Sequence, residues 1–184
     1  MLKTEVAVAR SCMGAGIIRP VAEGIQLSGR YVARYYENDE LVWEDDIINL
    51  ITTAGKNDQL DKYLAGSAYT ASWFVGLVDG GSAPVFDAAD TMASHAGWVE
   101  NTGYSQANRP AASWNAAASG TKALAAPASF STNASGTIAG AFLAANNTKS
   151  GTAGVLYSCG AFSGGNQPVS NNGTLTVSYQ TTLT

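Results

Sequence analysis

Hydrophobic and polar residues alternate with the two-residue period of a β-strand in two long segments of the chain. In Ile25–Glu37, the apolar face carries Leu27, Tyr31, Ala33 and Tyr35. In Thr174–Leu183, the apolar face carries Leu175, Val177 and Tyr179. Each segment is therefore predicted to be a strand with one face buried and one face in solvent.

A short polar turn follows the first strand. Glu37-Asn38-Asp39-Glu40 separates it from Leu41-Val42-Trp43, so the two segments are predicted to form a β-hairpin. The next segment, Asp45–Ile51, fits a strand and a helix equally well.

One helix is predicted, over Thr53–Ala65. Thr52 or Thr53 can cap its start, and Gly66 ends it. Leu60, Tyr63 and Leu64 recur at spacings of three and four, so they share one helix face.

A strand that is apolar on both faces opens the segment Ala71–Pro110. Trp73, Val75 and Leu77 point to one side and Phe74 and Val78 to the other, as in the central strand of a core. A long connection follows, and it contains His95. Its part Asp90–His95 is predicted to be a short helical turn with Asp90 as the N-cap.

The remaining apolar segments are short, and turn residues separate them. They are Gly97–Thr102, Ala111–Ala116, Ala128–Thr132, Thr137–Ala144 and Gly154–Phe162. Strands at this spacing without intervening helices predict a mainly β fold: an antiparallel, jelly-roll-like β-sandwich with one short helix. We expect one domain over residues 25–184, preceded by an extended N-terminal arm, residues 1–24.

Composition narrows the classes of function. Charged residues make up 13% of the 184 residues and the net charge is −4, so no basic stripe is present for binding nucleic acid. No segment approaches the roughly 20 apolar residues that cross a bilayer. Glu5 and Arg10 interrupt the N-terminal apolar run, which argues against a secretory signal. Cys12 and Cys159 then fit reduced thiols made in a cytoplasm, with a single disulfide left open.

The chain has few residues that could form a reactive site. His95 is the only histidine; Asp87 and Asp90 lie near it, but no G-x-S-x-G elbow is present. Two distant cysteines and one histidine do not make a zinc site, and Gly14-Ala15-Gly16 lacks the third glycine of a dinucleotide fingerprint. The pair Asp87 and Glu100, or the run Glu44-Asp45-Asp46, is a weak candidate for glycosidase carboxylates. Asp79, Asp87 and Asp90 are weak candidates for a calcium site, because Asp79-Gly80-Gly81 lacks the spacing of a calcium loop. We expect no enzyme, no metal and no cofactor.

Nine residues are candidates for contact with a partner. They are Arg10, Ile17, Ile18 and Arg19 in the arm, Arg30 and Arg34 on the exposed strand face, and the aromatic Trp98, Tyr104 and Trp114. Arginines on one face can hold an acidic partner, and exposed aromatic rings stack on sugars or anchor interfaces. The alternatives are solvated arginines and aromatic rings that cover the sandwich.

Several motifs in a fixed order resemble a known family. They are Asn49-Leu50-Ile51-Thr52-Thr53-Ala54-Gly55-Lys56-Asn57, Leu60-Asp61-Lys62-Tyr63, Trp73-Phe74-Val75-Gly76-Leu77, Asp90–Trp98, Gly103-Tyr104, Asn108-Arg109-Pro110, Ile138–Leu143 and Gly151–Tyr157. Together these motifs resemble small virion structural proteins of tailed bacteriophages, from Asn49 to the C-terminus.

The resemblance implies a non-enzymatic structural protein. Its expected role is that of a capsid decoration or cement protein on the capsid exterior, made in the host cytoplasm. Its expected partners are the major capsid protein, whose shell it stabilises, and sibling copies in a homo-oligomer. Contact with nucleic acid or membrane is not expected. The alternative is a tail or tail-fibre component that binds a host-surface glycan through Tyr104, Trp114 and the Ala-rich loop.

Overall fold

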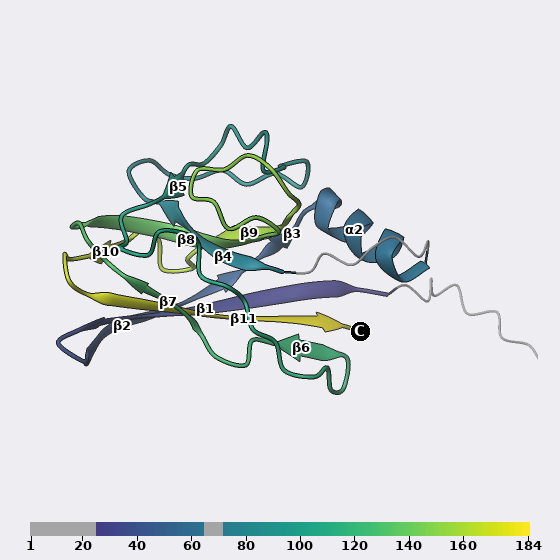
Figure 1. The fold of residues 1–184 in the computed structure, drawn as a ribbon, viewed down its shortest axis with the longest axis horizontal. Helices are drawn as coiled ribbons and strands as arrows, with labels where there is room; N and C mark the ends of the chain where they lie inside the picture. The colour runs from purple at the N-terminus through teal and green to yellow at the C-terminus, as the bar shows by residue number, and fades with distance from the viewer. Residues whose placement is uncertain (1–24, 65–71) are drawn as a thin grey trace, which may run out of the picture.

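Two antiparallel sheets pack face to face in a computed structural model, which describes residues 25–64 and 72–184 (Figure 1). The predicted antiparallel, jelly-roll-like β-sandwich with one helix is confirmed. The expected arm, residues 1–24, lies outside the described residues.

The first sheet contains five strands. They are β1 (Leu27–Glu37), β2 (Glu40–Ile48), β6 (Thr121–Ala123), β7 (Ala128–Ser131) and β11 (Thr174–Leu183). Strand β1 lies between β2 and β11, and β6 and β7 pair with β11 at different positions along that strand. The first and last strands therefore pair along most of their length, from Leu27 opposite Leu183 to Tyr36 opposite Thr174.

The predicted hairpin is formed by β1 and β2. Its turn places Asn38 at φ 50° and Asp39 at φ 67°, the left-handed region that short polar side chains tolerate. The ambiguous segment Asp45–Ile51 is extended: β2 continues to Ile48, and β3 (Leu50–Ile51) begins the second sheet.

The second sheet contains six strands. They are β3, β4 (Phe74–Asp79), β5 (Glu100–Asn101), β8 (Gly136–Ala144), β9 (Leu156–Ala161) and β10 (Gln167–Val169). Strand β4 pairs with β8 and β5, so the predicted central strand is confirmed, although it starts at Phe74. The expected strand at 97–102 shrinks to β5. The one expected at 111–116 forms only isolated bridges, at Ala111 and Trp114.

The second sheet is covered on both faces, which explains its two-sided apolar strands. Val75 and Leu77 face the main core between the sheets, together with Tyr31 and Phe130. On the other face, Val78 and neighbouring side chains of β8 and β9 pack beneath the long connection and its Trp98. The connection is therefore a structural cover, and each large side chain buried under it contributes about 1.5–3 kcal/mol.

Helix α2 (Thr53–Leu64) has the predicted start. The Thr52 hydroxyl accepts a hydrogen bond from the Gly55 amide at 3.0 Å, as an N-cap does. The helix face shared by Leu60, Tyr63 and Leu64 is exposed and does not pack on the sheet. The helix instead contacts the sheet through Gly55, whose missing side chain lets the two backbones approach: a Cβ there would lie 2.3 Å from the Tyr157 carbonyl oxygen.

Candidate interaction surface

The outer face of the five-stranded sheet carries the two arginines predicted to hold an acidic partner. Arg34 lies directly opposite Glu44 on β2, and their side chains form an ion pair at 2.5 Å. Arg30 also forms an ion pair, with Asp46, which lies diagonally across the hairpin because the direct partner of Arg30 is Ile48. The hydrogen bond to Glu44 raises the pKa of Arg34 above its usual value. Both guanidinium groups are thus neutralised within the chain, and exposed pairs of this kind contribute little to stability because water and salt screen them.

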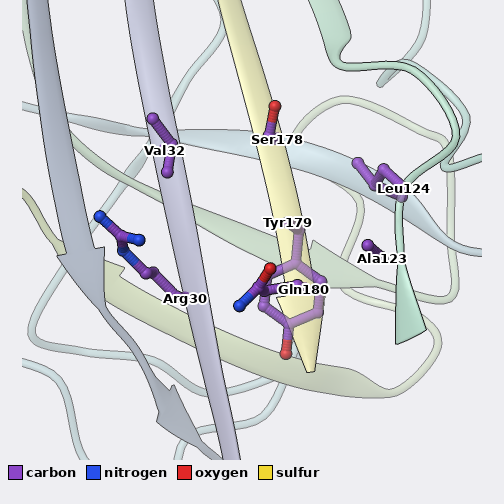
Figure 2. A pocket seen from close by; sticks show the side chains of 7 residues that line it. All are labelled: Arg30, Val32, Ala123, Leu124, Ser178, Tyr179 and Gln180. Atoms are coloured by element: carbon purple, nitrogen blue, oxygen red, sulfur yellow. The ribbon is translucent and has the colours of Figure 1, made fainter. Parts of the chain in front are cut away.

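A shallow depression lies on the same face, between β1, β11 and β6. Figure 2 shows Arg30 and Val32 on β1, Ser178 and Gln180 on β11 and Leu124 after β6 around it. Its volume is about 100 Å³. Pockets for drug-sized ligands typically measure about 300–1,000 Å³. The depression therefore suits a side chain of a partner protein better than a free ligand.

The acidic run on β2 makes a second hollow, whose central residue is Asp45. Burial raises the pKa of Asp45, but hydrogen bonds from Ser163, Gln167, Gly164 and the Asp46 amide outweigh that effect and hold it below the usual value. Each of the three acidic side chains thus has partners within the chain. In residues 25–64 and 72–184, no group of three or more His, Cys, Asp or Glu residues is arranged to hold a metal ion.

Two of the residues considered for catalysis, Asp90 and His95, contact Trp98. The Trp98 indole N–H donates to Asp90 Oδ2 at 3.0 Å, and the ring stacks on His95, with centroids 4.0 Å apart. His95 Nδ1 lies 3.0 Å from the Trp98 carbonyl oxygen. The predicted helical turn was wrong: Thr91 and Ser94 exchange backbone hydrogen bonds, and Asp90 accepts the Asp87 amide and the indole instead of capping a helix. This arrangement secures the cover over the sheet.

Two of the three aromatic contact candidates are buried, which corrects that expectation. Trp98 is 4% exposed and Tyr104 only 1%. Tyr104 packs edge-on against Phe130, and the Lys149 ammonium lies 3.7 Å from its ring centroid. Burial raises the pKa of Tyr104 well above its usual value. Both rings therefore belong to the buried clusters of the sandwich and do not form an exposed contact surface.

Trp114 retains partial exposure and packs edge-on against Tyr179 with a centroid distance of 6.1 Å. The other candidates, Arg10, Ile17, Ile18 and Arg19, lie outside the described residues. Arg30, Arg34 and Trp114 are therefore the candidates that the described surface presents, and all three lie on or beside the five-stranded sheet.

The sequence did not single out two groups of exposed apolar side chains. Leu41 and Val42, at the tip of the β1–β2 hairpin, are each 53% exposed. The second group is the α2 face of Leu60, Tyr63 and Leu64. For the second group, the sequence showed only that the three side chains share one face of a short helix. It did not show whether that face is buried or exposed.

Comparison of the chain with protein-family models and with curated proteins gave no match. Among the described residues, no helix is long and apolar enough to span a membrane. The motifs of the sequence and the geometry of the surface are therefore the basis for inferring a function.

Proposed function

We propose that this chain is a non-enzymatic structural protein of a tailed-bacteriophage virion, and specifically a capsid decoration or cement protein. It binds the shell of the major capsid protein from outside and stabilises it. The motifs between Asn49 and Tyr157 support the phage origin, and one structural observation supports the cementing role.

That observation is the distance between the exposed hairpin tip and the point at which residues 1–24 join the fold, at opposite ends of β1. The hairpin tip carries the exposed Leu41 and Val42, while residues 1–24 join the fold at Ile25, before the other end of the strand. At about 3.3 Å per residue, an 11-residue strand separates the two ends by roughly 36 Å. Figure 1 shows the hairpin and α2 at opposite ends of the long axis. A protein with separated contact points can join neighbouring subunits of a shell.

The hairpin is also held in one conformation. The Trp43 indole N–H donates to the Pro168 carbonyl at 2.8 Å, and its ring stacks on Tyr35 with centroids 5.5 Å apart. The cross-strand ion pair of Arg34 and Glu44 spans the same part of the hairpin. A tip held in this way loses little conformational entropy on binding, which favours affinity.

The remaining properties follow from this role. The partners are the major capsid protein and sibling copies in a homo-oligomer, on the exterior of a capsid assembled in the host cytoplasm. The proposal includes no cofactor, no metal, and no contact with nucleic acid or membrane.

The test is co-sedimentation of the purified protein with expanded shells of the major capsid protein. Leu41→Ser with Val42→Ser is expected to weaken binding at least tenfold, whereas Val85→Ser, at an equally exposed apolar residue far along the chain, leaves it unchanged. Deletion of residues 1–24 is expected to weaken binding as well. Unchanged binding by the hairpin variant, or virion heads without this protein by immunogold labelling, contradicts the proposal.

The tail-fibre alternative named Tyr104 and Trp114 as glycan-binding rings. Of these two, Tyr104 is buried and Trp114 remains partly exposed. Glycan-array binding that is lost on Trp114→Ala would favour that alternative over the decoration role.

A further inference from the structure

The exposed face of α2 is unusual for a short helix on a β-sandwich. Leu60, Tyr63 and Leu64 are 55%, 82% and 73% exposed and form one stripe along the last two turns. We call these three residues the α2 stripe. The contacts that hold the helix lie elsewhere: Gly55 packs on β9, and the Tyr157 hydroxyl donates to Gln59 Oε1 at 3.1 Å. Clustered apolar side chains of this kind mark an interaction site.

The stripe lies near the point at which residues 1–24 join the fold. The Tyr157 phenol that donates to Gln59 also lies close enough to the Thr181 side chain to interact with it, and Thr181 is the cross-strand partner of Gly29. Gly29 is four residues from Ile25, about 13 Å of extended chain. Ile25 is itself 82% exposed. In Figure 1, α2 and the start of β1 lie at the same end of the sandwich.

We propose that the α2 stripe is a docking surface for residues 1–24 of the same chain, with Ile17, Ile18 and Val21 as the side chains that cover it. Seven residues separate Ile18 from Ile25, a reach of up to about 25 Å. The whole of α2 is about 18 Å long at 1.5 Å per residue. Ile17 and Ile18 can therefore reach along the stripe, whereas Val21, four residues from Ile25, reaches about 14 Å and can cover only the part nearest the point of attachment.

Attachment of the segment beside the stripe selects this occupant over a second copy. A segment tethered a few residues from its site has an effective concentration in the millimolar range, far above that of free protein in dilute solution. Residues 1–24 are also too short a segment to form a hydrophobic core of their own, so their apolar side chains can be buried only by docking on another surface. This inference concerns the isolated chain and holds whether or not the protein decorates a capsid.

The test uses the full-length chain with Tyr63→p-benzoylphenylalanine, a photoreactive side chain of similar shape at a highly exposed position. Irradiation at micromolar concentration is expected to give adducts within the monomer that peptide mass spectrometry maps to residues 1–24. Their yield is expected to stay constant on tenfold dilution and to fall several-fold when Ile17, Ile18 and Val21 are replaced by Ser.

The matched control carries the same photoreactive side chain at Leu41, on the hairpin tip, where no adduct with residues 1–24 is expected. Adducts of dimer size would show that a second copy occupies the stripe, and adducts confined to residues 65–71 would assign it to that segment. Either result, or the absence of adducts with residues 1–24, overturns the proposal.

Discussion

The guanidinium of Arg109 contacts both carboxylate oxygens of Glu100, at 2.8 and 2.7 Å, and the two side chains are 0% and 5% exposed. Arg109 also donates to the carbonyl oxygens of Asn146 and Gly151 and lies over the Phe142 ring. This buried pair ties the long connection to the loop between β8 and β9. Its hydrogen bonds hold the long connection in place over the second sheet.

Removing one partner of this pair is expected to be severe. Arg109→Met leaves the Glu100 carboxylate buried without its cation, and the free energy of unfolding should fall by about 3–5 kcal/mol. Urea titration followed by tryptophan fluorescence measures the change. The exposed Arg34→Met is the control and should change the free energy of unfolding much less, because solvent screens its ion pair. If Arg109→Met costs no more than Arg34→Met, the pair does not fasten the cover.

Gly55→Ala tests the close approach of α2 to β9. Alanine favours a helix over glycine by about 1 kcal/mol, so propensity alone predicts stabilisation. The added Cβ would lie 2.3 Å from the Tyr157 carbonyl oxygen, and we expect overpacking to dominate, with a net loss of about 1–3 kcal/mol. Thermal unfolding by circular dichroism gives the sign. Lys56→Ala, at the exposed neighbouring position, is the control and should be neutral or slightly stabilising. If Gly55→Ala stabilised the protein, α2 would be able to move away from β9 at little cost.

Asp45 is expected to make stability depend on acidity. Its pKa in the folded chain is lowered by its hydrogen bonds, so its contribution is fully present above the unfolded value of 3.8 and is lost as the pH falls below about 4. The melting temperature of Asp45→Asn should therefore fall less than that of the wild type between pH 7 and pH 3. Asp61→Asn, the same substitution on the surface of α2, controls for the loss of one charge. Parallel curves for Asp45→Asn and the wild type would contradict this assignment.

The thiol of Cys159 is expected to be inert in the folded chain. Burial, with a smaller effect from the Asp90 carboxylate, raises the pKa of Cys159 to about 12. At pH 8 the thiolate that reacts with disulfide reagents is almost absent. In a Cys12→Ser background, titration with Ellman's reagent should detect no thiol until denaturant is added, and then one. If one thiol per chain reacted rapidly with the reagent in the folded protein, that result would contradict the burial of Cys159.

The period of apolar residues was enough to predict most of the strands. Burial of one face of a strand requires alternation, and burial of both faces requires continuous apolar residues; β1 and β4 show these two patterns. The hairpin turn was equally local, because Asn38 and Asp39 suit left-handed backbone wherever they occur. These features depend on neighbours in sequence, which is why the sequence alone determined them and the sandwich that they form.

Only the tertiary structure decided which apolar and charged side chains reach the surface. The stripe of Leu60, Tyr63 and Leu64 has the spacing of a packed helix face, but the backbone contact at Gly55 turns it outward. Nothing in the local sequence marks Arg109 as buried, yet it lies in the interior because the connection brings Glu100 to it. Burial depends on which distant segments fold over a residue, and pairing depends on strand register; neither is encoded in local periodicity.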